Sequence, residues 1–136
     1  NLHGAPLSAG TQIRPGLIVY RFAHAMYFAN SQLMRDEISE LTRSSAPPLR
    51  WFCIDISAVD DIDYTAQTTL EDLDCALAAQ SIRLVFMHNV SEPRERSRTQ
   101  IVTQFGARVM FDSLPDLLSS YDLSGASVKP KVRGSE

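Results

Sequence analysis

Acidic side chains gather in one short stretch of the sequence, where Asp60, Asp61 and Asp63 stand close together. Carboxylate oxygens can hold a hard cation, or they can cap the exposed amides at the start of a helix, where the helix dipole favours negative charge. A hard-cation site uses about six to eight oxygens, more than this turn clearly offers. The pattern therefore favours helix capping over a metal site, and the same charges would repel a phosphate group.

Arg94, Arg96 and Arg98 form a second group of side chains that could do chemistry. Residues two apart on a helix do not face each other, so these cations fan around the helix and form no single stripe. Glu95 lies among them and lowers the local positive charge. The spacing favours an ordinary solvated helix face, and contact with an anion, a nucleotide or a lipid headgroup stays open as the alternative.

The patterns of common catalytic and cofactor sites do not occur in the sequence. His3, His24 and His88 lie in separate segments, so no paired spacing suggests a zinc site. The chain has no G-x-S-x-G elbow, no Cys-His signature and no glycine-rich phosphate cradle. We therefore expect a protein that is not an enzyme and that holds no metal or cofactor.

The two cysteines, Cys53 and Cys75, fall in an apolar run and in a helical pattern. Without companion cysteines they fit buried, reduced thiols better than a disulfide framework. A reducing cytoplasm is the simpler environment for this chain.

Length and charge limit the class of protein. The 136 residues suffice for one domain with its own core, and the net charge of -3 offers no basic face for nucleic acid. No apolar stretch approaches the roughly 20 residues that cross a bilayer as a helix. We expect a single domain over residues 1–136, with its core at about 12–123 and a mobile tail at about 124–136. The chain begins at Asn1 without a visible signal peptide and reads as a piece of a longer protein.

The segments that must position the candidate side chains alternate between strands and helices. Runs rich in β-branched and aromatic residues predict strands at Leu17–Phe22, Trp51–Ile56, Ile82–Met87 and Val109–Phe111, and residues Leu7–Ile13 could add an edge strand. The run that begins at Trp51 is apolar on both faces, as in a strand at the centre of a covered sheet.

Helical spacing of apolar residues fills the intervals between these strands. The first helix is expected to begin with Asn30 as its N-cap, to bury Met34, Ile38 and Leu41, and to end before Pro47. The second buries Ala66, Leu70, Leu73 and Leu77 and ends near Gln80. The third is capped by Ser91, has Pro93 in its first turn, buries Ile101, Val102 and Phe105, and ends at Gly106. A last short helix is expected at Leu114–Tyr121.

This alternation predicts an α/β domain built from parallel βαβ crossovers. In open α/β sheets, ligands gather beyond the carboxyl ends of the strands. That edge should carry Asp55, Ser57 and the turn from Asp60 to Thr65. It is therefore the candidate functional site.

Two segments resemble a known family. The stretch from Pro15 to Phe22 (PGLIVYRF), followed by Met26–Asn30 (MYFAN), resembles the opening of the STAS domain in bacterial sulfate permease (SulP) anion transporters. The stretch from Asp55 to Asp63 (DISAVDDID), which runs into Tyr64, Thr65, Ala66 and Leu70, looks like the STAS signature shared with anti-sigma-factor antagonists. The resemblance covers roughly Gln12 to Leu123.

The resemblance implies a STAS fold, with a mixed, mostly parallel sheet of four or five strands flanked by about four or five helices. It also implies a regulatory domain on the cytoplasmic face of a multi-pass membrane transporter, which moves an anion such as sulfate. The implied partners are the transmembrane domain of that permease and a cytosolic protein, with weak guanine-nucleotide binding as a further expectation and a monomer as the state of the isolated domain.

The signature also predicts a docking turn, formed by Asp55, Ser57, Asp63, Tyr64 and Thr65. In the antagonist relatives, the residue after the signature aspartate is a phosphorylated serine. Here that residue is Tyr64, Ala66 replaces the signature glycine, and a phosphate on Thr65 would be repelled by Asp63. The interaction surface is therefore carried over without the phosphorylation.

Three functions remain in competition. The first is a transporter-attached regulatory module, and the second is a free-standing partner-switch protein that binds a regulatory kinase or a sigma-factor inhibitor. The third is weak nucleotide sensing, with contacts at Asp55–Thr65 and at Arg94, Arg96 and Arg98. For Tyr64 itself two interpretations stay open: a partly exposed docking residue, or a residue that packs over the sheet edge with its hydroxyl hydrogen-bonded.

Overall fold

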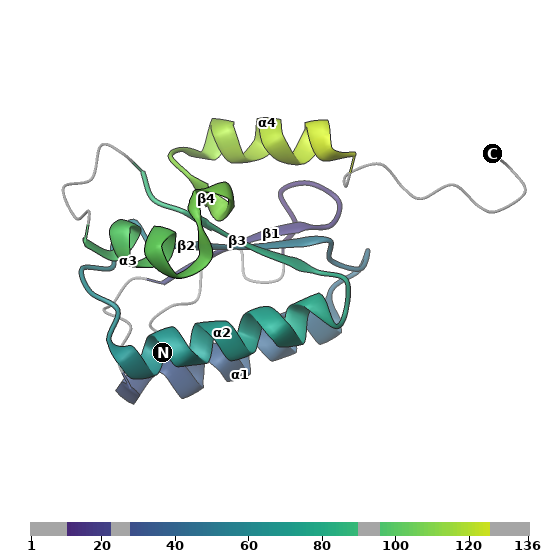
Figure 1. The fold of residues 1–136 in the computed structure, drawn as a ribbon. Coiled ribbons are helices and arrows are strands. Elements are labelled where there is room, and N and C mark those ends of the chain that lie inside the picture. Colours follow the sequence, from purple (N-terminus) through teal and green to yellow (C-terminus); the bar gives the residue numbers. More distant parts are fainter. Residues whose placement is uncertain (1–10, 23–27, 90–95, 126–136) are drawn as a thin grey trace, which may run out of the picture.

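The fold is an α/β arrangement built on one four-stranded parallel sheet. The computed structural model describes residues 11–22, 28–89 and 96–125 (Figure 1). The strands β1 (Leu17–Arg21), β2 (Trp51–Asp55), β3 (Arg83–Met87) and β4 (Met110–Phe111) lie in the order β1-β2-β3-β4. Every neighbouring pair is parallel, with Leu17 opposite Trp51 and Trp51 opposite Arg83. The α/β prediction is confirmed.

The predicted edge strand at Leu7–Ile13 is not observed among the residues of this segment that the structure describes. Residues 11–13 belong to no strand, and residues 7–10 lie outside the described ranges. The antiparallel pairing found among the described residues is an isolated bridge between Arg14 and Leu17.

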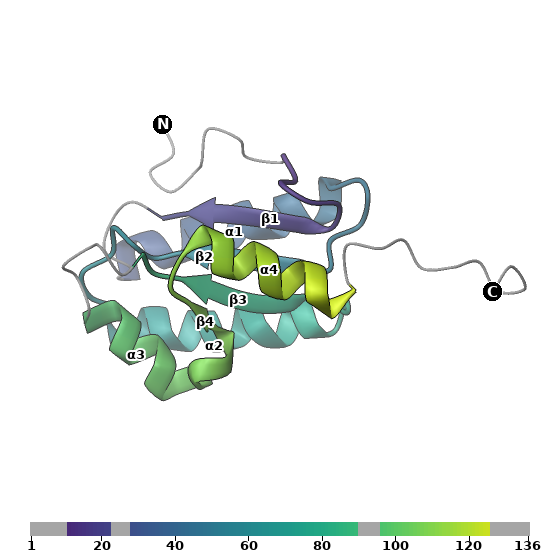
Figure 2. The same ribbon diagram turned by 90° about the horizontal axis from the view of Figure 1, so that it is seen from above.

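Helices cover both faces of the sheet. The helices are α1 (Phe28–Ser44), α2 (Tyr64–Ala78), α3 (Arg96–Phe105) and α4 (Leu114–Ser124), with a short 3-10 helix, η1 (Ala107–Val109), before β4. Figure 1 shows α1 and α2 side by side on one face and α4 on the other, and Figure 2 shows α4 lying over the sheet. Helices α1 and α2 therefore lie on the face of the sheet opposite α4.

The sheet has two apolar faces because alternate residues of each strand point in opposite directions. One face carries Ile18, Tyr20, Phe52, Ile54, Leu84 and Phe86 against α1, α2 and α3. The other face carries Leu17, Trp51, Cys53, Val85 and Met87 against Leu117 and Tyr121 of α4. All five residues of β2 are buried, which confirms it as a central strand covered on both sides.

Helix boundaries agree with the sequence signals at several points. Ala66, Leu70, Leu73 and Leu77 are buried along α2, as their spacing predicts. Helix α3 is followed by Gly106, whose φ of 95° lies in the left-handed region that glycine adopts freely. Helix α4 is capped by Ser113 and ends at Ser124, three residues beyond the predicted end at Tyr121. Gly125 follows the helix with a φ of 80°.

The start of α1 differs from the sequence prediction. Helix α1 begins at Phe28, so the expected N-cap at Asn30 is wrong, because Asn30 already lies inside the helix. The helix ends at Ser44, ahead of Pro47, as predicted. The expected cap Ser91 and the first-turn Pro93 of the third helix lie outside the described residues.

The two cysteines differ in environment. Cys53 is buried in β2, whereas Cys75 is exposed, so the prediction of a buried thiol is correct for Cys53 and wrong for Cys75. Cys75 lies two positions from both Leu73 and Leu77, which places it away from the buried stripe of α2.

No helix among the residues that the structure describes has both the length and the apolar character that crossing a bilayer requires.

Candidate functional site

The carboxyl ends of the strands bring Asp55 and Ser57 together in the interior. Asp55 is the last residue of β2 and is only 7% exposed. Its Oδ1 accepts a hydrogen bond from the Ser57 backbone N–H at 2.9 Å, and its Oδ2 lies 4.0 Å from Nη1 of Arg21. The Ser57 hydroxyl accepts from the backbone N–H of Asn89 at 2.9 Å. Both side chains therefore hold loop backbone in place.

The thiol of Cys53 lies on the same strand and is fully buried. Burial raises the pKa of Cys53 well above its ordinary value, and the negative charge of Asp55 raises that pKa further. A thiol with a raised pKa stays protonated at neutral pH and is a poor nucleophile.

Two carboxylates of the aspartate turn, those of Asp61 and Asp63, have different structural roles. Asp63 is the N-cap of α2, and its Oδ1 accepts from the backbone N–H of Ala66 at 2.8 Å. The capping interpretation of the sequence is therefore confirmed for Asp63. Asp61 turns instead to α3, where its Oδ1 lies 3.0 Å from Nε of Arg96 and accepts from Nε2 of Gln100 at 3.1 Å.

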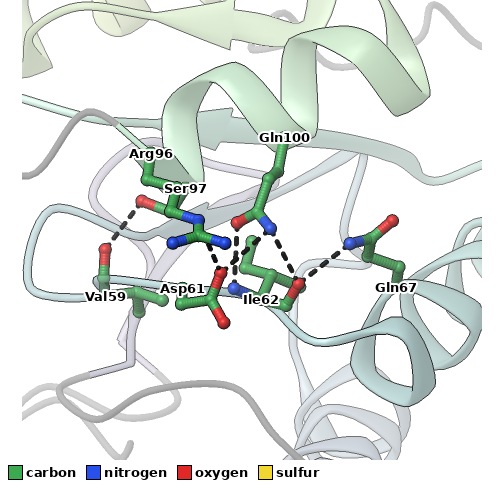
Figure 3. A network of polar contacts seen from close by, with 7 residues as sticks. All are labelled: Val59, Asp61, Ile62, Gln67, Arg96, Ser97 and Gln100. Atoms are coloured by element: carbon green, nitrogen blue, oxygen red, sulfur yellow. Dashed lines mark hydrogen bonds and ion pairs between the residues drawn. The ribbon is translucent and has the colours of Figure 1, made fainter.

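Helix α3 holds the turn before α2 through a polar network, shown in Figure 3. The Gln100 side chain pairs with both backbone groups of Ile62: the Ile62 N–H donates to Oε1 at 2.9 Å, and Nε2 donates to the Ile62 carbonyl at 3.0 Å. The Ser97 hydroxyl donates to the Val59 carbonyl at 2.7 Å, and Gln67 Nε2 donates to the Ile62 carbonyl at 2.8 Å. The backbone that leads into α2 is therefore fixed on two sides.

Sequence reasoning did not identify Ser97 or Gln100. A signal existed, because Ser97 lies one helical turn before Ile101, on the face that the apolar spacing marks as buried. A hydroxyl at such a position needs a partner from elsewhere in the fold, here the Val59 carbonyl.

Tyr64 stands apart from the rest of the turn because it faces solvent. It is the first residue of α2, and it is 81% exposed. Thr65 is also exposed. The predicted exposure of Tyr64 is confirmed, and the alternative in which its ring packs over the sheet edge is wrong. The candidate site thus separates into a buried part, Asp55 and Ser57, and an exposed part, Tyr64 and Thr65.

The predicted arginine group is also divided. Arg96 pairs with Asp61, and Arg98 forms an ion pair with Asp112, with Nη2 and Oδ1 3.0 Å apart. Arg94 lies outside the described residues. An anion that bound Arg96 or Arg98 would have to compete with an aspartate that is already in place.

An open groove of about 420 Å³ runs between α2 and α3. From α2 it is lined by Tyr64, Gln67, Thr68 and Glu71, and from α3 by Thr99, Gln100, Thr103 and Gln104. Gln104 Nε2 donates to the backbone carbonyl of Gln67 at 2.7 Å, and this bond joins the two helices. Within the described ranges, no group of three or more His, Cys, Asp or Glu side chains could hold a metal ion.

Comparison with known proteins places this fold. Residues 8–113 match the STAS domain family. The chain is 26% identical over 118 residues to the probable sulfate transporter 3.5 of Arabidopsis thaliana, in an alignment that takes in 86% of this chain and 19% of the transporter. The chain thus spans about a fifth of the length of that relative.

Solved structures show the same fold at low sequence identity. The murine anion transporter Slc26a9 in its inward-facing state superimposes with a TM-score of 0.64 and 16% identity, over 83% of this chain and 18% of the transporter. The STAS domain of a SulP transporter from Vibrio cholerae superimposes with a TM-score of 0.58 and 16% identity, over 85% of this chain and 88% of that domain. The family match and the shared fold together show that this chain belongs to the STAS domain family.

Proposed function

We propose that this chain is the cytoplasmic regulatory domain of a SulP-type membrane anion transporter, and that it acts by docking through the first turn of α2. The transmembrane part of the transporter is the proposed partner. Sulfate is the proposed anion, since the curated relative is named a sulfate transporter.

The observation that carries the docking proposal is the exposure of Tyr64. Asp55, Ser57, Asp61 and Asp63 all make hydrogen bonds within the domain. Tyr64, by contrast, presents a large aromatic side chain to solvent from a helix start. Exposed aromatic side chains that enter a partner's pocket contribute a large share of the binding energy at protein interfaces.

The hydrogen bonds around Tyr64 also suit a docking surface because they hold the backbone that displays this side chain. The Asp63 cap fixes the start of α2, and the Gln100 side chain fixes the backbone at Ile62. A side chain displayed from a fixed backbone loses little conformational entropy when it binds.

The transporter assignment has a direct test in the gene. The reading frame upstream of Asn1 should encode a series of apolar segments of about 20 residues each. A reading frame without such segments would contradict the assignment.

The regulatory role is tested by deletion. The transporter without residues 12–125 should still insert in the membrane, and its rate of anion uptake should change. Uptake identical to that of the intact transporter, at equal amounts of protein in the membrane, would contradict a regulatory role.

Weak binding of guanine nucleotides is the further part of this proposal, at Asp55–Thr65 and the arginines of α3. Because Arg96 and Arg98 are paired with Asp61 and Asp112, a phosphate must displace a carboxylate, and we expect dissociation constants of about 1 mM or weaker. A titration with GTP can be followed by the amide chemical shifts of the domain. The amide signals of these residues and their neighbours should shift. Shifts confined to other parts of the domain would contradict this placement.

A further inference from the structure

The α2 wall of the groove between α2 and α3 belongs to an acidic segment of the chain. From Trp51 to Ile82 the sequence has no Lys, Arg or His, and it has seven carboxylates: Asp55, Asp60, Asp61, Asp63, Glu71, Asp72 and Asp74. Three of these carboxylates are paired with arginines from other elements, Asp55 with Arg21, Asp61 with Arg96 and Asp72 with Arg35. Within the described ranges, Glu71 and Asp74 of α2 make no ion pair, so α2 keeps negative charge.

Glu71 contributes that negative charge directly to the groove. It lines the groove, is exposed, and makes no ion pair with the residues that the structure describes. Tyr64 lines the same groove from the start of the same helix. An aromatic ring attracts a cation to its face, and a carboxylate pairs with a cation, so both side chains select for positive charge.

We propose that this groove binds an extended basic peptide segment, with one Arg or Lys side chain against the ring of Tyr64 and a second paired with Glu71. The inference rests on the proposed docking function and adds the chemistry of the partner. Thr99 and Thr103 line the groove from α3, and their hydroxyls can hydrogen-bond the backbone of such a peptide.

The spacing of the two positions restricts the peptide. Tyr64 and Glu71 are seven residues apart on α2, which corresponds to about 10.5 Å along the helix axis. In a polyproline II segment, residues i and i+3 point in the same direction and lie about 9.3 Å apart. A peptide with basic residues three positions apart therefore matches the groove, and flexible side chains cover the remaining difference.

The cytosolic face of a membrane protein can supply such a segment. Short cytoplasmic loops that flank membrane spans carry an excess of Lys and Arg. Under the proposed function, a basic loop of the transporter's own transmembrane part is the occupant of the groove.

The inference can be tested with this chain and synthetic peptides, by isothermal titration calorimetry at low ionic strength. One nine-residue peptide of Gly, Pro and Ser carries arginines at its fourth and seventh positions. A second carries them at its fourth and fifth positions, and a third carries glutamates at the fourth and seventh positions. We expect the first peptide to bind most tightly, and the glutamate peptide not to bind.

Variants of the chain locate the binding. Tyr64→Ala and Glu71→Gln should each raise the dissociation constant of the first peptide about threefold. Leu123→Ala and Asp116→Asn make matched changes at exposed positions of α4, on the other side of the sheet, and should leave the affinity unchanged. Equal binding of the two arginine peptides, or equal losses in Asp116→Asn and Glu71→Gln, would overturn the inference.

The inference and the proposed function fail in different ways. If the peptides do not bind but Tyr64→Ala still lowers uptake by the intact transporter, the basic-peptide inference is wrong and the docking proposal stands. If the first peptide binds with the expected dependence on Tyr64 and Glu71 but uptake is unchanged in Tyr64→Ala, the inference stands and the docking proposal is wrong.

Discussion

The side-chain amide of Gln100 pairs with both backbone groups of Ile62, with an N–H to Oε1 distance of 2.9 Å and an Nε2 to carbonyl distance of 3.0 Å. Ile62 is fully buried and lies just before the capping residue of α2. Gln100 of α3 thus helps to fix the position from which α2, and with it Tyr64, begins.

Gln100→Ala should lower the free energy of unfolding by about 2 kcal/mol, because it leaves the Ile62 N–H without its partner inside the protein. Chemical denaturation measures this difference. Gln80→Ala is the matched control, since Gln80 is exposed and its side chain makes one long hydrogen bond, to the Ala76 carbonyl at 3.4 Å. We expect that control to change the free energy by under about 0.5 kcal/mol. Equal losses in the two variants would contradict the role given to Gln100.

Gly16 illustrates a second long-range constraint. It has a φ of 90°, and an added Cβ would lie 2.5 Å from the Tyr121 hydroxyl. Its carbonyl accepts from the backbone N–H groups of Arg50 at 2.7 Å and Trp51 at 3.0 Å, so the backbone is not free to move away. Gly16→Ala should therefore lower the free energy of unfolding by about 3 kcal/mol, because backbone strain and steric overlap act together.

Gly125→Ala provides the comparison for Gly16. Gly125 has a φ of 80°, and no atom lies within 4 Å of the position its Cβ would take. This substitution should cost only about 1 kcal/mol, from backbone strain alone. Similar losses of melting temperature in the two variants would show that the contact with Tyr121 is unimportant.

Alkaline pH should destabilise the domain. Burial raises the pKa values of Tyr20 and Cys53, and burial is also the main cause of the raised pKa of Tyr121. In the unfolded chain these groups ionise near their ordinary pKa values of 10.0 for Tyr and 9.0 for Cys. Above those values the unfolded state loses protons that the folded state keeps, so the free energy of unfolding falls as pH rises. Below about pH 8 these groups should cause no change.

Tyr121→Phe isolates one of these contributions. The variant loses the hydrogen bond from the Tyr121 hydroxyl to the Pro15 carbonyl, 2.5 Å in length, and should be about 1 kcal/mol less stable at pH 7. Above about pH 10, its free energy of unfolding should fall less steeply than that of the parent, by up to about 1.4 kcal/mol per pH unit. Denaturation at several pH values measures both effects, and parallel curves for the two proteins would contradict the assignment.

Local sequence signals predicted the elements that carry the site. The spacing of Ala66, Leu70, Leu73 and Leu77 identified the buried face of α2, and the aspartates before it indicated helix capping, although not which of them is the cap. The apolar run at Trp51 identified the central strand. These features depend on residues that are close in sequence, so their periodicity and propensity are sufficient to predict them.

Local sequence signals could not predict contacts between distant segments. Gln100 is 38 residues from Ile62, and Tyr121 is 106 residues from Pro15, so no local pattern relates them. The division of the predicted site has the same origin. Asp55 and Ser57 are buried where β2 ends, and Ser57 is bonded to Asn89, 32 residues away, whereas Tyr64 remains exposed at the start of the next helix.

The most direct test of the account combines two measurements on Tyr64→Ala: the free energy of unfolding of this chain, and anion uptake by the intact transporter. Because Tyr64 is 81% exposed, the variant should lose under about 1 kcal/mol of stability, while uptake falls. Leu123→Ala, at a position 85% exposed on α4, should leave both quantities unchanged. A loss of about 3 kcal/mol or more, typical of a buried aromatic residue, or unchanged uptake by the Tyr64→Ala transporter, would contradict the docking role of Tyr64.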